Sequence, residues 1–133
     1  MASPTPEQEQ LINEQTIGML ATLMRDGTPQ LTPINYAYQD GRFLMSTTKE
    51  RAKYHNIRRN ATVSLAVAGD GWRPYVTVYG TAEIEEQDYT RIAEGTAAVA
   101  SRMSDRPLPD NFADALRQQK RVLIVLTPER FVP

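Results

Sequence analysis

Two Asp-Gly dipeptides divide the first part of the chain into three apolar runs, and this pattern constrains the fold more than any other. The runs cover residues 16–23, 30–38 and 42–47, and Asp26-Gly27 and Asp40-Gly41 lie in the two gaps. Asp-Gly favours the positive backbone φ angles of tight hairpin turns. The sequence therefore predicts three consecutive strands that pair in an antiparallel meander.

Three further strands and four helices complete the predicted pattern. The strands are predicted over residues 62–67, 75–84 and 121–127. The helices are predicted over residues 6–14, 51–59, 87–103 and 112–119. Thr5 and Gln8 have the spacing of a capping box at the start of the first helix. We therefore predict a mainly β (α+β) fold, a six-stranded antiparallel barrel with peripheral helices, in one domain over residues 1–133.

The composition excludes several kinds of site. The chain has no cysteine and one histidine, which excludes disulfides, thiolate catalysis and a zinc site of several histidines within one chain. No apolar run reaches the ~20 residues of a membrane span, and residues 1–10 are too polar for a secretory signal. A net charge of −1 argues against general nucleic-acid binding. We expect a cytoplasmic protein with a small-molecule partner.

Most of the positive charge that points to a ligand lies in one segment, residues 46–59. The cations of this segment are Lys49, Arg51, Lys53, Arg58 and Arg59. Only one carboxylate lies among them, so the local charge is +4 in a chain whose net charge is −1. A nucleic-acid binder usually spreads its charge over a larger surface, so this concentration indicates a small anionic ligand.

Arg51 and Lys53 fall at the predicted start of the helix that follows the third strand. Free backbone N–H groups with cations beside them make a phosphate site. The preceding strand end supplies the hydroxyl groups of Ser46, Thr47 and Thr48. No acidic residue is spaced for pairing within the helix, so the positive charge is expected to stay uncompensated locally. A solvated helix face is the alternative for the two cations.

Further candidates lie outside this phosphate site, and each has two interpretations. Arg58 and Arg59 either meet a second anionic group or lie on a solvated surface. Trp72, in a glycine-rich turn, either packs on the protein or covers a planar ring of a ligand. Asn35 and Tyr36 either contact the polar edge of a cofactor or are an outward polar residue and a core tyrosine.

Three motifs follow one another along the chain. They are Ile17-Gly18-Met19-Leu20-Ala21-Thr22-Leu23 with Asp26-Gly27-x-Pro29-Gln30, then Arg51-Ala52-Lys53 with Asn56-x-Arg58-Arg59, then Gly71-Trp72 with Val78-Tyr79-Gly80-Thr81-Ala82. Together they resemble the flavin- and deazaflavin-binding split-barrel family, the pyridoxamine-phosphate-oxidase-like fold. Within it, the chain looks most like the branch of enzymes that use the deazaflavin coenzyme F-420. The resemblance runs from about Leu11 to Leu126.

The resemblance implies a split barrel that forms a homodimer, with two cofactor sites at the interface. Arg51 and Lys53 match the family's phosphate-binding pair. Ser46 and Thr47 match strand-end positions that touch the ribityl or phosphate part of the cofactor. The strand expected beside the cofactor ring carries Thr32, Pro33, Ile34 and Asn35. The loop expected to approach the cofactor carries Trp72 and Arg73.

One departure from the family favours F-420 over FMN. Family oxidases that bind FMN tightly carry Arg and Lys on the second strand, whereas residues 31–36 contain no cation here. Arg58 and Arg59 suit a longer anionic group, such as the lactyl-oligoglutamate tail of F-420. Asn60-Ala61, where relatives often have Asp-Pro, is a variation at the helix exit.

The resemblance therefore implies an oxidoreductase that uses reduced F-420 to transfer a hydride to an electron-poor small molecule. The alternatives are an FMN-dependent oxidase or reductase of the same fold, and a carrier that binds F-420 or FMN without turnover. A haem-binding role is less favoured, because His55 is the only imidazole and lies in the anion-binding segment, where it is expected to be neutral and structural. No general acid stands out, and Tyr36, Tyr79 and Arg73 are the candidates beside solvent.

Overall fold

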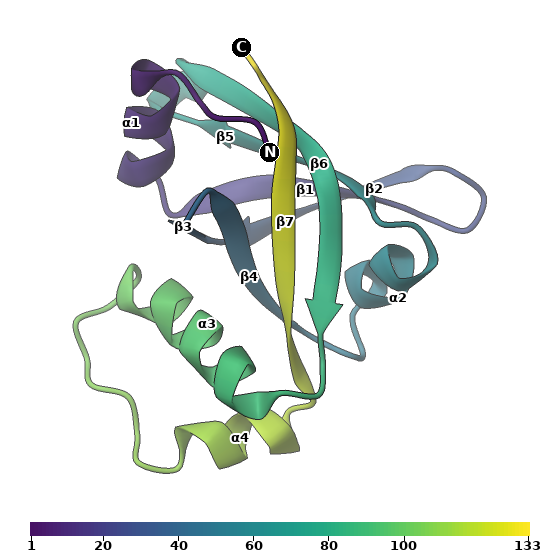
Figure 1. Cartoon of the computed structure of the whole chain (residues 1–133), viewed down its shortest axis with the longest axis vertical. Coiled ribbons are helices and arrows are strands. Elements are labelled where there is room, and N and C mark those ends of the chain that lie inside the picture. Colours follow the sequence, from purple (N-terminus) through teal and green to yellow (C-terminus); the bar gives the residue numbers. More distant parts are fainter.

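The computed structural model describes residues 1–133 and consists of one antiparallel sheet with helices at its margins (Figure 1). The helices are α1 (Pro6–Glu14), α2 (Ala52–Arg59), α3 (Tyr89–Ser101) and α4 (Phe112–Gln118), with a 3-10 helix, η1 (Asp70–Trp72). The strands are β1 (Ile17–Leu23), β2 (Pro29–Asn35), β3 (Ala37–Gln39), β4 (Arg42–Thr48), β5 (Thr62–Ala68), β6 (Tyr75–Glu85) and β7 (Arg121–Val132). None of the helices has the length and apolar composition needed to cross a membrane.

The local signals in the sequence produce the predicted local structures. The Thr5 hydroxyl accepts from the Gln8 N–H at 3.2 Å, and the Gln8 side chain accepts from the Thr5 N–H at 2.9 Å, which completes the capping box of α1. Both hairpin turns use positive φ angles, 88° at Gly27, 53° at Asp40 and 79° at Gly41. These turns fix the antiparallel pairing of β1 with β2 and of β3 with β4.

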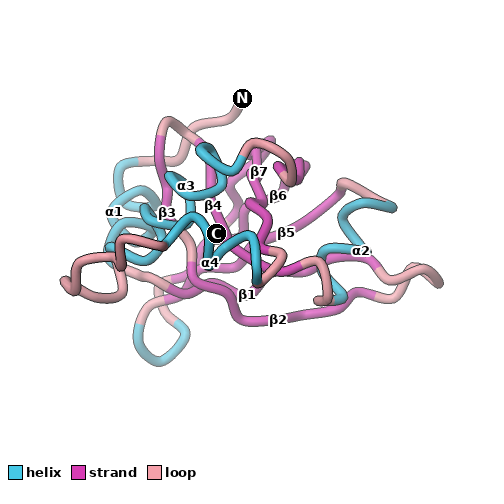
Figure 2. The backbone as a smooth tube through the Cα atoms, turned by 90° about the horizontal axis from the view of Figure 1, so that it is seen from below, coloured by secondary structure: helices cyan, strands magenta, loops and turns pink.

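The sheet curls strongly because its two edge strands are consecutive in the chain. The strand order is β2-β1-β5-β6-β7-β4-β3, and all neighbours are antiparallel. Only Tyr36 separates the end of β2 from the start of β3. Two Cα steps span less than about 8 Å, so the two edges of the sheet meet at this residue. The sheet therefore curls into a half-barrel, and Figure 2 shows β1 and β2 crossing below β4, β6 and β7.

The prediction of six strands is wrong, because residues 30–38 form two strands instead of one. β2 pairs with β1 as far as Asn35, and β3 pairs with β4 from Ala37 onward. Between them, Tyr36 donates its N–H to the Thr16 carbonyl at 3.0 Å and buries its ring in the core. The barrel therefore has seven strands.

The last strand is longer than the predicted range 121–127, since β7 continues to Val132. The pairing of β6 with β7 shifts register between Tyr79 and Gly80, and Pro128 lies opposite Gly80 at this irregularity. Bulges tolerate proline, which has no N–H to give to the ladder. Pro128 therefore interrupts the sequence pattern of the strand without ending the strand.

The sheet separates two apolar clusters. The larger cluster fills the barrel and includes Ile12 from α1 together with Leu20, Phe43, Leu65 and Val78 from the strands, all of them fully buried. The smaller cluster packs α3 and α4 on the other face of β7, through Ile92, Leu116, Leu123 and Val125. Burial of this kind stabilises by roughly 25 cal/mol per Å² of apolar surface. It holds α3 and α4 against β4 and β7, where they form one wall of a cleft.

Tyr36 is the buried joint between β2 and β3, and its replacement by phenylalanine is expected to destabilise the fold by about 1–3 kcal/mol. Its hydroxyl donates to the Ile12 carbonyl at 2.6 Å, and burial raises the pKa of this phenol to about 12. The substitution leaves the carbonyl without this partner. Urea unfolding measures the loss. Tyr38→Phe is the matched control, because the half-buried Tyr38 hydroxyl makes no hydrogen bond, and equal losses in both variants would contradict the expectation.

Candidate functional site

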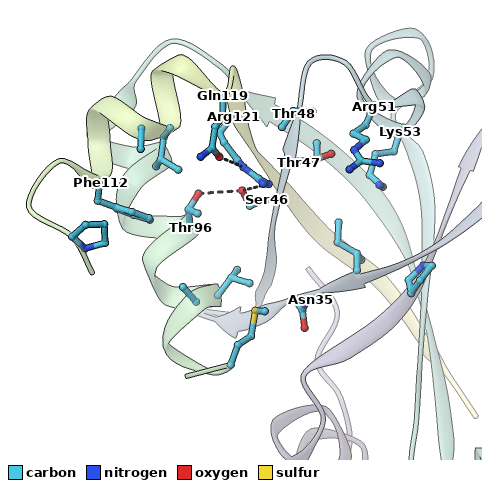
Figure 3. Close-up of a pocket in the computed structure, with 18 residues that line it drawn as sticks. Asn35, Ser46, Thr47, Thr48, Arg51, Lys53, Thr96, Phe112, Gln119 and Arg121 are labelled. Carbon is cyan, nitrogen blue, oxygen red and sulfur yellow. Dashed lines mark hydrogen bonds between the residues drawn. The ribbon is translucent and has the colours of Figure 1, made fainter. Parts of the chain in front are cut away.

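A cleft of about 660 Å³ opens between the end of β4 and the helices α3 and α4 (Figure 3). Its polar lining includes Asn35, Ser46, Thr47, Thr48, Arg51, Lys53, Thr96, Gln119 and Arg121. Its apolar lining includes Pro33, Ile34, Val99, Ala100, Met103, Phe112 and Leu116. Three cations and no carboxylate line the cleft, so its chemistry suits an anionic ligand with an apolar body.

Arg51 and Lys53 come together at the start of α2, as the sequence predicts. Arg51 is the N-cap residue, with extended backbone angles of φ −81° and ψ 147°, and no side chain caps the helix. The first turn of α2 therefore keeps free N–H groups beside two cations, which is the arrangement that binds phosphate. Neither side chain has a carboxylate partner, since Lys49, Arg58 and Arg91 make all the salt bridges of the structure.

Lys53 is half-buried in the cleft, and this burial, with the neighbouring Arg51, lowers the pKa of its ammonium from 10.5. A bound anion favours the charged form and raises this pKa again. Affinity for an anion is therefore constant below the lowered pKa and falls as the pH rises through it.

We expect the affinity for inorganic phosphate to begin falling at a lower pH than an ordinary lysine would produce. Calorimetric titration between about pH 8 and pH 11 tests this, because phosphate itself keeps one charge state over most of that range. Lys53→Arg is expected to remove the pH dependence, since an arginine stays charged throughout. A pH profile that is unchanged in this variant would show that another group is responsible.

The end of β4 supplies the hydroxyl groups of the cleft. Ser46 lies in a short hydrogen-bonded chain, 3.4 Å from the Thr96 hydroxyl and 3.5 Å from Nη1 of Arg121. Thr47, which points to the opposite face of the strand, is buried, and both residues line the cleft; that they touch a cofactor stays a prediction. Figure 3 shows Arg121 and Arg51 on opposite sides of these hydroxyls.

Arg121 is a residue of the cleft that the sequence analysis did not single out. It is the first residue of β7 and lies directly opposite Thr48 in the antiparallel register. Its Nε donates to the Gln119 side chain at 3.0 Å. In the sequence, Arg121 is marked only as a cation at the start of a strongly apolar strand. Its contact Ser46 in β4 lies 75 residues earlier, so the sequence alone does not place Arg121 in the cleft.

The strand expected beside a cofactor ring lies only partly in the cleft. Pro33, Ile34 and Asn35 line the cleft, whereas Thr32 does not. Thr32 is half-buried and pairs with Leu20 of β1. The end of β2 nearest to the Tyr36 joint is therefore the part of the strand that faces a ligand.

Arg58 and Arg59 lie at the other end of α2, outside the cleft. Arg58 is ion-paired with Glu86 at 2.6 Å, and Lys49 lies 3.7 Å from the same carboxylate. Arg59 donates to the Leu23 carbonyl at 3.2 Å and to Asn56 at 2.9 Å. The expectation that this positive charge is uncompensated is wrong for Arg58, because Glu86 follows β6 and approaches from outside the helix. That either arginine holds an anionic tail stays a prediction.

Trp72 and Arg73 lie in a second groove, of about 770 Å³, on the outer face of β1, β2 and β5. The Trp72 side chain is 75% exposed, so the protein leaves most of its ring uncovered. Pro33 lines both the cleft and this groove, so the two hollows meet at β2. Within one chain, Trp72 does not reach the phosphate-binding residues.

The candidate proton donors are also outside the cleft. Tyr36 is a core residue, Arg73 belongs to the second groove, and the ring of Tyr79 lies 4.5 Å below the guanidinium of Arg130. His55 is exposed on α2, edge-on to Tyr54 at 5.1 Å between ring centroids. No group of three or more potential metal-ligating side chains occurs in the structure.

Comparison with known proteins agrees with this architecture. The family model described as "Pyridoxamine 5'-phosphate oxidase" matches residues 4–132. A solved structure named "F420 Reductase" is 31% identical with a TM-score of 0.75, over 97% of this chain and 98% of that one. The conserved hypothetical protein Rv2991 from Mycobacterium tuberculosis is 27% identical with a TM-score of 0.81, over 98% and 84%. HutZ, a heme storage protein from Vibrio cholerae, is 20% identical with a TM-score of 0.73, over 94% and 89%, a likeness of fold alone.

Proposed function

Because the chain belongs to the pyridoxamine 5'-phosphate oxidase family, we propose that its cleft binds coenzyme F-420 and that the protein is an F-420-dependent reductase. The cofactor choice is supported by the 31% identity, over nearly the full length of both chains, to a structure named as an F420 reductase. The single observation that carries the proposal is the charge of the cleft, which has three cations and no carboxylate.

The residues of the cleft fit the parts of such a cofactor. Arg51, Lys53 and the uncapped first turn of α2 supply charge and N–H donors for a phosphate. Ser46 and Thr47 supply hydroxyls for a polyhydroxy chain. At the end of β2, Pro33 and Ile34 supply apolar surface and Asn35 supplies a side-chain amide for a planar ring. When bound, reduced F-420 supplies the hydride that reduces an electron-poor double bond of a small molecule.

The chain's own residues bind and orient in this reaction, and the one side chain of the cleft suited to donate a proton, the Lys53 ammonium, is assigned to the phosphate. No carboxylate, imidazole or phenol lines the cleft. We therefore propose that the proton that accompanies the hydride comes from solvent. The absence of cysteine is compatible with a cytoplasmic location, which we propose as well.

Parallel titrations of the purified protein with F-420 and with FMN test the proposal. We expect quenching of F-420 fluorescence at micromolar cofactor and much weaker binding of FMN, because β2 carries no additional cation. Reduced F-420 should then be oxidised by a member of a panel of enones and quinones. Tight FMN binding would support the FMN-dependent alternative, and F-420 binding without turnover would support a carrier. Binding of neither cofactor would overturn the proposal.

We further propose that the protein is a homodimer that pairs through the outer face of β1 and β2. This face exposes large apolar side chains, at 53% for Ile17 and 63% for Leu31, and Trp72 of η1, 75% exposed, lines the groove beside it. Exposed apolar patches of this kind mark interaction surfaces. The groove on this face shares Pro33 with the cleft, so a partner seated there would also cover one side of the cofactor site.

The oligomeric state of charged variants tests the dimer. Leu31→Glu places a carboxylate on the proposed interface and should convert the protein to a monomer in light-scattering chromatography. Met24→Glu is the control, since Met24 is 45% exposed but lies in the β1–β2 turn. A wild-type monomer at micromolar concentration would contradict the proposal, and a dimer that resists Leu31→Glu would place the interface elsewhere.

A further inference from the structure

Arg121 lies in the cleft on the far side of β4 from the phosphate-binding pair (Figure 3). It is half-buried, and its position is fixed at both ends. The backbone is paired with Thr48 of β4, and the guanidinium donates to Ser46 at 3.5 Å and to Gln119 at 3.0 Å. The side chain is therefore held in place and is not a mobile surface arginine.

The charge of Arg121 has no partner within the protein. Its two hydrogen-bond acceptors are a hydroxyl and an amide oxygen, both uncharged. It forms none of the salt bridges of the structure, and the cleft contains no carboxylate. By contrast, Arg58 on α2 is ion-paired with Glu86. A half-buried guanidinium with only neutral acceptors is a site where an anion from outside is favoured.

The total charge of the cleft exceeds what one phosphate group neutralises. Arg51, Lys53 and Arg121 contribute three positive charges. A phosphate carries at most about two negative charges at neutral pH, so at least one cation remains for a second anionic group. Arg121 is that cation, because Arg51 and Lys53 are neighbours at one helix start and Arg121 belongs to a different strand.

We infer that Arg121 is a second anion-binding site, separate from the phosphate site, and that it takes a carboxylate. A single planar guanidinium matches a carboxylate in both charge and shape. The apolar side chains of Phe112 and Leu116 line the same cleft and accommodate the body of such a ligand. The identity of the ligand rests on the proposed function, which offers two sources, the acidic tail of F-420 and a carboxylate-bearing substrate.

Two variants, Arg121→Gln and Arg121→Lys, separate these sources in cofactor titrations. Arg121→Gln is expected to weaken long-tailed F-420 about tenfold and leave FMN within twofold, if the tail is the source. Arg121→Lys keeps the charge and should recover part of this loss. Arg42→Gln, which removes an exposed cation at the start of β4, controls for the change in net charge.

A pair of probes tests the site without the cofactor, by NMR titration with trans-cinnamate and its neutral analogue cinnamamide. The wild type should prefer cinnamate, and Arg121→Gln should reduce that preference, which Arg51 and Lys53 alone do not maintain in full, while thermal melting shows an intact fold. A reduced preference with unchanged F-420 affinity assigns the site to a substrate. If F-420 fails to bind at all, the proposed cofactor is wrong, and the cinnamate preference still decides the role of Arg121. An Arg121→Gln variant that changes neither F-420 affinity nor the cinnamate preference would overturn the inference.

Discussion

Replacement of both Arg51 and Lys53 by alanine is expected to weaken F-420 binding about 100-fold or more. Each cation offers the phosphate a charge-assisted hydrogen bond, and such bonds contribute about 1.5–3 kcal/mol. Loss of both therefore removes at least about 3 kcal/mol of binding free energy, which corresponds to a factor of about 100 in Kd. Fluorescence titration of the double variant measures the effect.

The same double variant is expected to be at least as stable as the wild type. Two cations at the start of α2 oppose the positive end of the helix dipole, and no side chain caps that end. Lys53 is also disfavoured as a cation by burial and by Arg51, as its lowered pKa indicates. Arg25→Ala with Arg42→Ala is the matched control, because both cations are exposed and distant from the cleft. Unchanged F-420 affinity in an intact Arg51→Ala/Lys53→Ala variant would remove these residues from the binding site.

Gly80→Ala is expected to destabilise the fold by about 3 kcal/mol, which is severe for the addition of one methyl group. A Cβ at this position would overlap the Thr127 carbonyl oxygen and lie 3.0 Å from its carbon. Those atoms belong to the backbone of β7, so no side-chain rotation relieves the overlap. The strands approach this closely at the register shift between Tyr79 and Gly80. Urea unfolding measures the loss.

Gly95→Ala is the comparison that separates backbone crowding from side-chain crowding. Its Cβ would meet the end of the Leu123 side chain at 2.5 Å, and a leucine can change rotamer. Alanine also favours the helix by about 1 kcal/mol over glycine. We therefore expect a smaller loss than at Gly80. The reverse order of stabilities would mean that α3 cannot shift against β7.

Features determined by nearby residues could be predicted from the sequence. The capping box of Thr5 and Gln8 and the turns at Asp26-Gly27 and Asp40-Gly41 depend on residues at most three apart. The meeting of Arg51 and Lys53 in one cleft followed from a strand end and a helix start that adjoin in the chain. The resemblance then supplied the barrel, which the family match and the solved structures support.

Features determined by distant pairing could not be predicted in the same way. At Tyr36 the chain stops pairing with β1 and starts pairing with β4. The β-compatible residues continue through Tyr36 without a break, so the sequence does not mark this change of pairing partner. Arg121 enters the cleft because β7 inserts between β6 and β4. Glu86 neutralises Arg58 across 28 positions of sequence. A single sequence displays such contacts only once the topology is known.

The place of β7 in the sheet also sets the order in which the protein can be completed during translation. β7 separates β6 from β4, and without it β4 pairs only with β3 and β6 only with β5. The nascent chain therefore carries an open barrel on the ribosome until β7 emerges. The same strand brings in Arg121 and seats α3 and α4, so the ligand-binding cleft forms only once β7 is in place and not gradually. Until then the unpaired edges of β4 and β6 are available to other strands, which makes this the stage at which the chain is most exposed to aggregation.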